Sequence, residues 1–491
     1  MDRRPLAAVT FALLLVLAGC TVGYQSDAPE PSEPPADDHL GYYDGYWYND
    51  TFDIDPSTGL SQGEQRAVFS RAMARIQLLR GLEFEERIDI ELITRKQFRE
   101  EYGGQAFPTP NESVRQLDNV QHEALFLVNE SEDVVAVRQG NRGDTVLGFY
   151  QPSNEQIVIV SKSRPATLTD EITLAHELVH ALQDQRFGLP STGRTLDGVN
   201  ARNGLIEGDA TLVQKRYERR CASGAWQCVS VQGGGAGGGS PGASFHFGVY
   251  FVGFFPYAEG PSFVQYHEQR GGWDAIDDMY GAVPTDAAEV IYPETYATDA
   301  YGNATVTDRA DADWQRITTP RGDYAEIGQS GLASMFAYTA FEDRTRGVIS
   351  RDDFRNLNEN GSLNDIRQFR YDVTYAEGWY GDRLYAYTSG GDTAFVWNVT
   401  FNGPANATEF QRGYEQVFEF WGGERVGTRN GGTVWTFGDA DRFGGAVWIQ
   451  RTDNSVMVVK APRAGELDDV YAPVGQARVS ARTGASAGAN A

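Results

Sequence analysis

Two histidines spaced four residues apart are the feature of this sequence that most clearly suggests chemistry. His176 and His180 flank Glu177, Leu178 and Val179, and residues four apart lie one turn above each other on the same face of an α-helix. Two imidazole nitrogens placed in this way reach one Zn²⁺ ion at about 2.0–2.1 Å and leave it open to water. Glu177, beside both rings, is suited to take a proton from that water. The motif therefore predicts a zinc site with Glu177 as the catalytic base.

A third protein ligand must come from elsewhere in the chain, and a later segment provides a carboxylate. Glu207 follows His180 by 27 residues and stands near the start of an expected helix, among small residues that allow two helices to approach closely. Asp209 is the rival ligand. Asp184, one turn beyond His180, suits a role in holding a histidine better than ligation through its short side chain. We expect the two histidines and Glu207 to bind Zn²⁺, with Asp184 and Asp209 as supporting neighbours.

Helical and strand periodicities predict the elements that position these residues. Apolar residues recur along one face of residues 168–187, and Thr169, Asp170 and Glu171 offer an N-terminal cap and favourable first-turn charge. A small twisted sheet with helices on one side should precede this helix, with helices at 62–80, 95–102 and 113–123 and strands at 88–93, 124–128, 134–138, 146–150 and 157–160. Further helices are expected at 204–219, 263–269 and 274–280, with a flexible glycine-rich loop at 233–239.

The pattern resets near residue 320, which predicts a second domain. Helices at 328–341 and 408–421 alternate there with aromatic-rich strands at 385–387, 394–400, 433–437, 445–450 and 456–460. The fold class expected for the whole chain is α+β. The expected boundaries are a signal peptide at 1–19, a tether at 20–41, a metal-binding domain at 42–310, a second α+β domain at 320–474 and a disordered tail at 475–491.

The N-terminus has the features of a targeting signal. Arg3 and Arg4 precede an apolar run from Leu6 to Leu17, which is too short to span a bilayer as a mature helix. The run ends in Leu-Ala-Gly-Cys, which resembles the lipobox of prokaryotic lipoproteins, in which the cysteine is lipidated and becomes the new N-terminus. The lipidated residue would be Cys20, followed by an acidic, proline-rich tether. We expect attachment to the membrane through this lipid, on the extracellular face.

Assigning Cys20 to the lipid leaves two of the three cysteines as a pair. Cys221 and Cys228 lie seven residues apart, and outside the cell they are expected to form a disulfide. A zinc site at this pair is disfavoured because no second cysteine pair or nearby histidine completes four ligands. Sites compatible with N-glycosylation occur at Asn49, Asn111, Asn129, Asn303, Asn360, Asn398 and Asn406.

The net charge argues against nucleic acid as a partner and indicates an environment of concentrated salt. Asp and Glu outnumber Lys and Arg by 68 to 42, which gives a net charge of −26. Binding of nucleic acid is therefore not expected, because phosphates require a basic surface. An acidic, lysine-poor surface is typical of a halophilic protein, since concentrated salt screens the self-repulsion of its charges. An ordinary acidic secreted protein is the alternative.

The metal motif and the later Glu-Gly-Asp-Ala-Thr run resemble the gluzincin clan of zinc metallopeptidases, the thermolysin-like group. The resemblance implies that residues 42–310 form a zincin-like catalytic domain that hydrolyses peptide bonds in a peptide or protein substrate. A longer set of motifs resembles an uncharacterised family of haloarchaeal surface lipoproteins and spans nearly the whole mature chain. These motifs are GYYDGYWYND, RGLEF, PYAEGPSFV, RGGWDAIDDMY, PETY and EGWYGDR.

Three points of the peptidase pattern stay open in the sequence. In thermolysin-like enzymes an Asp four residues after the third ligand holds the first histidine, whereas this chain has Thr211 there. The donors that would stabilise the transition state are not identifiable, and Tyr292 and His246 rank ahead of His267 and Tyr296. In the EGWYGDR motif, which contains Trp379, Asp382 and Arg383, a buried ion pair under an aromatic lid is favoured over substrate contact.

Two further classes of function remain beside the peptidase. One is a non-catalytic surface binding or envelope-organising lipoprotein with a structural or degenerate zinc site. The other is the solute-binding lipoprotein of an importer, which should show two α/β lobes without a metal-binding helix. An intact Glu177 favours the peptidase, because a structural zinc site needs no base at that position.

Overall fold

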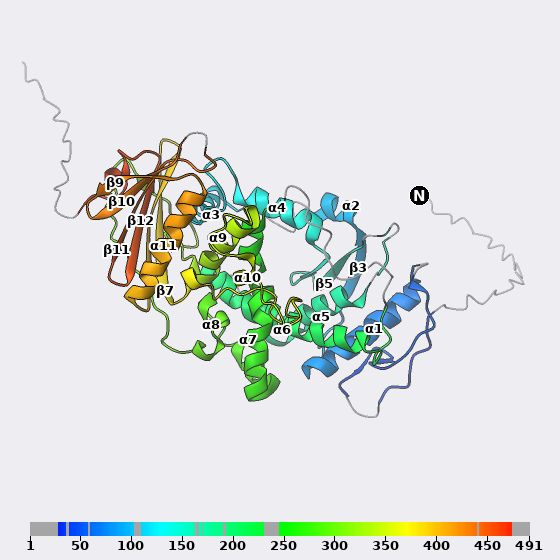
Figure 1. The fold of residues 1–491 in the computed structure, drawn as a ribbon. Coiled ribbons are helices and arrows are strands. Elements are labelled where there is room, and N and C mark those ends of the chain that lie inside the picture. The colour runs from blue at the N-terminus through cyan, green and yellow to red at the C-terminus, as the bar shows by residue number, and fades with distance from the viewer. Residues whose placement is uncertain are drawn as a thin grey trace, which may run out of the picture.

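Helices dominate the first two-thirds of the chain and strands the last third (Figure 1). The computed structural model describes residues 28–35, 39–56, 59–102, 110–161, 163, 166–168, 170–189, 193–229, 245–438 and 441–473. The mixture of helices and strands agrees with the expected α+β class. The signal peptide with Cys20, the glycine-rich run 233–239 and the tail 475–491 lie outside the described residues.

The first long helix, α1 (Gln62–Arg80), has both of its ends determined by local sequence. The Ser61 side chain accepts from the backbone of Glu64 and Glu64 returns a hydrogen bond, while Gly81 ends the helix with a positive φ of 77°. A short hairpin, β1 (Tyr42–Tyr43) and β2 (Tyr46–Trp47), packs against it.

A three-stranded sheet follows in the order β3 (Asp89–Thr94), β5 (Gln156–Ser161), β4 (Gly148–Gln151), with β4 antiparallel to β5 at one edge. These strands confirm the runs expected at 88–93, 146–150 and 157–160. The helix expected at 95–102 is a short α2 (Arg95–Gln97) that continues as a π-helix, Phe98–Tyr102.

The two strands expected at 124–128 and 134–138 are wrong. Ala124 ends helix α3 (Glu112–Ala124), and the apolar residues after it form a buried turn. Residues 134–145 form helix α4 (Val134–Thr145), whose N-cap is Asp133. The β-branched residues at its start suggested a strand, but the cap and packing against later helices outweigh this weak propensity.

Three long helices make up the centre of the molecule (Figure 1). They are α5 (Glu171–Phe187), α6 (Leu196–Ala222) and α7 (Phe247–Met279). The expected start of α6 at 204 is eight residues too late, because Thr195 caps the helix earlier. The two helices expected at 263–269 and 274–280 belong to α7, which is kinked where Gly272 has a φ of 71°.

The remaining elements form a seven-stranded antiparallel sheet and the helices around it. Helix α11 (Pro404–Phe420) packs on one face of this sheet and helix α12 (Leu467–Val470) contacts its far side. The edge strand β9 (Glu424–Arg429) has no counterpart among the expected strands, since its polar residues give no apolar alternation. The elements are α8 (Ala287–Ile291), a 3-10 turn Pro293–Thr295, β6 (Gln315–Arg316), α9 (Gly328–Glu342), α10 (Arg351–Phe354), a 3-10 turn Thr374–Ala376, β7 (Trp379–Ser389), β8 (Asp392–Phe401), α11 (Pro404–Phe420), β9 (Glu424–Arg429), β10 (Gly432–Thr436), β11 (Ala446–Thr452), β12 (Ser455–Ala461) and α12 (Leu467–Val470).

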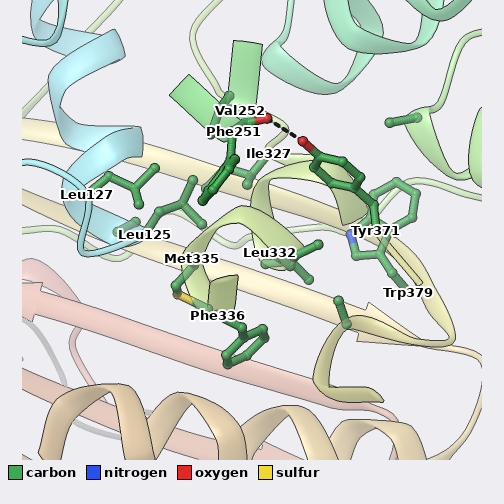
Figure 2. Packing of buried hydrophobic residues seen from close by; sticks show 14 of the residues in the cluster. Leu125, Leu127, Phe251, Val252, Ile327, Leu332, Met335, Phe336, Tyr371 and Trp379 are labelled. Carbon is green, nitrogen blue, oxygen red and sulfur yellow. Dashed lines mark hydrogen bonds between the residues drawn. The ribbon is translucent and has the colours of Figure 1, made fainter. Parts of the chain in front are cut away.

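One apolar core joins the central helices to this sheet. It runs from the turn after α3 through α7 and α9 to strands β7 and β8, and Figure 2 shows Leu125, Phe251, Leu332 and Trp379 among its members. The Tyr371 hydroxyl donates to the Phe251 carbonyl across the same core at 2.7 Å. Residues before and after position 320 therefore share their packing.

The Asp382 carboxylate caps helix α9 rather than pairing with its neighbour Arg383. It accepts from the backbone amides of Ile327 and Gly328, each at 2.9 Å, and from two tryptophan indoles. Arg383 pairs with Glu326 instead, at 3.0 Å. The expected buried ion pair of the EGWYGDR motif is therefore wrong, although the site is buried and aromatic as expected.

Three further sequence features have a place in the fold. Cys221 and Cys228 form a disulfide with a Cα–Cα distance of 5.6 Å, as expected. Asn398 is buried in β8 and hydrogen-bonds to the Thr305 carbonyl, which leaves no room for a glycan at that sequon. No helix within the described ranges combines the length and apolarity needed to cross a bilayer.

Candidate metal centre

A buried ionic network anchors the N-terminus of α5, the helix with both histidines. Asp170 is the N-cap and accepts from the amides of the first turn at 3.0 and 3.1 Å. The next residue, Glu171, is fully buried and pairs with Arg71 at 2.7 Å and Arg75 at 2.9 Å, both from α1. Its carboxylate also accepts from the Tyr217 hydroxyl of α6. Three helices are thus tied together at the beginning of the motif.

Helices α6 and α7 cross at a contact that only glycine permits. A Cβ atom added to Gly208 would lie 2.4 Å from the Gly260 carbonyl oxygen, and one added to Gly260 would lie 2.3 Å from the Gly204 carbonyl oxygen. Real Cβ atoms do not approach so closely, so the backbones are in direct contact. Glu207 is on this stretch of α6, which the sequence indicated by its small residues.

The three expected metal ligands converge on one point. The His176 and His180 Nε2 atoms are 3.2 Å apart, and the Glu207 Oε2 atom lies 3.3 and 3.2 Å from them. Within the described part of the chain this is the one group of three or more His, Cys, Asp or Glu side chains arranged to hold a metal. A regular tetrahedron with edges of this length has a centre-to-corner distance of about 2.0 Å, which matches zinc–ligand bonds.

The hydrogen bonds made by the two Nδ1 atoms determine whether the Nε2 atoms can act as ligands. His176 Nδ1 lies 2.9 Å from Gln214 Oε1, and His180 Nδ1 lies 2.9 Å from Gln183 Oε1. Because an amide oxygen only accepts, each Nδ1 carries the proton and each Nε2 presents a lone pair. Glu207 Oε2 is buried without any hydrogen-bond donor. Three acceptors therefore face one point, an arrangement that a cation satisfies and a neutral cavity does not.

The charges around this point favour a positive ion. Burial alone would lower the pKa of His180, but the Glu207 carboxylate raises it to about 9. Burial would raise the pKa of Glu207, and the two histidines hold it well below its usual value. Burial raises the pKa of Glu177, which the two histidines oppose. Glu177 is 7% exposed and stands beside the three donors without being one of them.

Asp209 and Asp184 both lie near the motif, in roles other than those expected. Asp209 is not a metal ligand: it accepts from Arg80 at 3.0 Å, from Tyr280 at 2.8 Å and from the amide of Gln183 at 3.3 Å. Asp184 holds neither histidine. It accepts from the Tyr150 hydroxyl at 2.9 Å and caps the backbone after α5.

The tyrosine beside the three candidate ligands is Tyr257, which sequence reasoning missed. Its ring stacks on His176 at a centroid distance of 6.1 Å, and its hydroxyl is within hydrogen-bonding reach of the Glu207 carboxylate. Burial, followed by the negative charges of Glu207 and Glu177, raises the pKa of Tyr257 well above its usual value. The ring remains 36% exposed. The PYAEGPSFV motif contains this residue, and that was the available signal.

The four donors considered from the sequence bond elsewhere. His246 is the N-cap of α7, eleven residues or about 16 Å of helix before Tyr257, and its Nε2 contacts the Leu127 carbonyl at 2.8 Å. The Tyr292 hydroxyl accepts from Gln329 at 3.1 Å, in the apolar core. The rings of His267 and Tyr296 meet edge to face, with their centroids 5.4 Å apart. The structure brings none of these four to His176, His180 and Glu207.

Comparison with known proteins finds one family model, without a described activity, that matches a segment of the chain. Residues 315–471 match the family model described as a domain of unknown function, DUF8575. No curated protein matches the chain significantly. No solved structure does so either. The matched segment contains the seven-stranded sheet and excludes the metal centre, so the comparisons leave the centre to be interpreted from its own geometry.

Proposed function

We propose that this protein is a zinc-dependent peptidase that hydrolyses peptide bonds with a water molecule activated by Glu177. The observation that carries the proposal is the trio of acceptor atoms on His176, His180 and Glu207, spaced by 3.2–3.3 Å, with a buried carboxylate next to it on the same helix. A purely structural site would be expected to fill its fourth position with a protein ligand. Of the described residues, only three offer themselves as ligands.

Each residue near the centre has a role in this proposal. A bound zinc ion would polarise the scissile carbonyl and lower the pKa of a water molecule toward about 7. Glu177 takes the proton from the attacking water and later gives it to the leaving amine, and its raised pKa suits both steps. The Tyr257 hydroxyl is placed to donate a hydrogen bond to the oxygen that becomes negative in the transition state.

The edge strand β4 supports a peptide as the substrate. A Cβ atom added to Gly148 would lie 3.2 Å from the Glu177 Cγ atom, so this strand runs directly beside the base. β4 pairs only with β5 among the described strands. Its other edge can therefore accept an extended peptide through backbone hydrogen bonds.

We further propose that the enzyme acts on the outer face of the cell membrane, anchored by a lipid on Cys20. Two observations support this location: the signal-like N-terminus and the disulfide between Cys221 and Cys228, which oxidising surroundings maintain. The net charge of −26 supports a peptide or protein partner rather than nucleic acid. The same charge supports an organism that grows in concentrated salt.

The test of the catalytic role is Glu177→Gln, which keeps the size of the side chain and removes the base. Wild type and variant are loaded with zinc in high salt and incubated with an unfolded protein mixture, and the products are identified by mass spectrometry. Hydrolysis should fall by about 10²–10⁴ while zinc remains bound. The matched control is Glu218→Gln, which removes a carboxylate from the surface of α6 and should cleave as wild type.

Two outcomes would contradict the proposal. Zinc-dependent cleavage that persists undiminished in Glu177→Gln would mean that another group is the base. Absence of cleavage by wild type across a broad range of substrates would favour the non-catalytic surface lipoprotein, in which the zinc site is structural or degenerate.

A further inference from the structure

The two histidines of the metal centre are held by amides, although carboxylates are a frequent choice at such positions. Gln214, two turns after Glu207 on α6, accepts from His176, and Gln183, within α5, accepts from His180, both at 2.9 Å. The position where thermolysin-like enzymes have an Asp is occupied by Thr211, whose buried hydroxyl has no hydrogen-bond partner. The side chain that accepts from His176 here is Gln214, three residues further along α6.

The amide of Gln183 can lie only one way round. Its Nε2 donates to the Ile206 carbonyl at 3.0 Å and to Asp209 Oδ2 at 3.3 Å, so its oxygen must face His180. Gln183 is 1% exposed. The order of donors and acceptors therefore turns the His180 ring so that Nδ1 faces Gln183 and Nε2 faces the metal position.

Both amides are neutral, and the negative charge of Asp209, the carboxylate next to Gln183, is balanced by another residue. Asp209 pairs with Arg80 at 3.0 Å and accepts from Tyr280. The one anionic ligand, Glu207, also interacts with the positive charge of Arg202. The ligands and their partners thus contribute a single negative charge, that of Glu207.

We propose that Gln214 and Gln183 are positioning residues that fix both histidines as neutral Nε2 ligands without adding negative charge to the metal centre. This inference rests on the zinc site proposed above. A carboxylate partner makes an imidazole a stronger ligand by drawing its Nδ1 proton, and an amide does so less. The site therefore binds its metal less tightly than it would with carboxylate partners. The bound ion would then be a stronger Lewis acid toward a substrate carbonyl.

The two positions should respond differently to the same substitution. Gln214→Glu places an anionic acceptor on His176 without another carboxylate among its hydrogen-bond partners. Gln183→Glu removes the donor that Ile206 and Asp209 require and sets two carboxylates against each other in a buried place. The first change should tighten metal binding, and the second should weaken it.

The experiment measures the zinc dissociation constant of the mature protein by competition with a chromophoric chelator in molar KCl at neutral pH. Gln214→Glu should bind zinc about 10-fold more tightly than wild type, and Gln214→Leu, which has no acceptor, about 10–100-fold less tightly. Gln185→Glu adds the same charge on α5, at a residue that hydrogen-bonds to backbone 100 residues away in sequence, and should leave the affinity unchanged. Circular dichroism of the metal-free variants checks that they are folded.

The opposite signs expected for Gln214→Glu and Gln214→Leu separate positioning from a merely structural role, which would weaken binding in both. If Gln214→Leu fails to fold, Gln214→Glu decides alone, because it retains the acceptor. The proposal is overturned if Gln214→Glu binds no more tightly than wild type, or if folded Gln214→Leu binds equally well. Wild type that binds no zinc would instead contradict the proposed function.

Discussion

Replacing Glu171 with glutamine should loosen helix α5 without touching a metal ligand. The carboxylate accepts four hydrogen bonds in a fully buried place: from Arg71, Arg75, Tyr217 and the backbone of Val229. A glutamine of the same size offers one oxygen to these donors and turns its amide group toward the others. Both arginines, 1% and 0% exposed, would lose their anionic partner.

Removing one partner of a buried ion pair costs about 3–5 kcal/mol, because the remaining charge stays buried and uncompensated. At about 1.4 kcal/mol for each factor of ten, this penalty corresponds to an increase of about 10²–10⁴ in the population of molecules in which α5 is open. The surface variant Glu218→Gln removes a partner of Lys215 that is 41% exposed. It should change stability by less than about 1 kcal/mol.

Hydrogen exchange followed by mass spectrometry measures this opening directly. Peptides that cover α5 should exchange about 10²–10⁴ times faster in Glu171→Gln than in wild type, and at the wild-type rate in Glu218→Gln. Acceleration of less than about tenfold would refute the reasoning, because it would show that the buried carboxylate contributes little to the position of helix α5.

Three further outcomes follow from the fold. Gly208→Ala should lower the melting temperature, because its Cβ would lie 2.4 Å from the Gly260 carbonyl oxygen, whereas Gly253→Ala meets nothing within 4 Å and should not. Burial, with a nearby arginine, lowers the pKa of His122 to about 3, so His122 stays neutral in the folded state while the unfolded chain takes up a proton below about pH 6.5. The free energy of unfolding should therefore decrease as the pH is lowered from about 6.5 toward 3, and should decrease less steeply in His122→Gln. The melting temperature of the mature protein should rise between about 0.1 and 3 M KCl, since salt screens the net charge of −26; no rise would remove the argument for a halophile.

Local signals in the sequence were sufficient to predict helix α5 and the convergence of His176, His180 and Glu207. Asp170 caps the helix, apolar residues line one side of it, and the four-residue spacing sets both histidines on one face. Glu207 was identifiable because small residues around it indicated a close helix crossing, which Gly208 and Gly260 provide.

The residues that sequence reasoning missed depend on contacts between distant segments. Tyr257 reaches His176 only because α7 continues through Pro256 and Pro261, residues that argue against a helix when the sequence is considered alone. Gln214 lies within the helix expected at 204–219, on the same face as Glu207, but the spacing alone does not indicate that its amide meets His176 from the neighbouring helix. The core that joins α7 to β7 and β8 could not be inferred either, since its members are far apart in the chain.

Metal analysis of purified mature protein tests the central claim most directly. After challenge with a nanomolar-affinity chelator, wild type should retain one zinc ion per chain, Asp209→Ala should also retain it, and His176→Ala and Glu207→Ala should not. The distinction follows from the structure, in which Glu207 Oε2 faces both histidine nitrogens while Asp209 pairs with Arg80. Zinc that stays bound in Glu207→Ala and is lost in Asp209→Ala, or that is absent from wild type, would contradict the account.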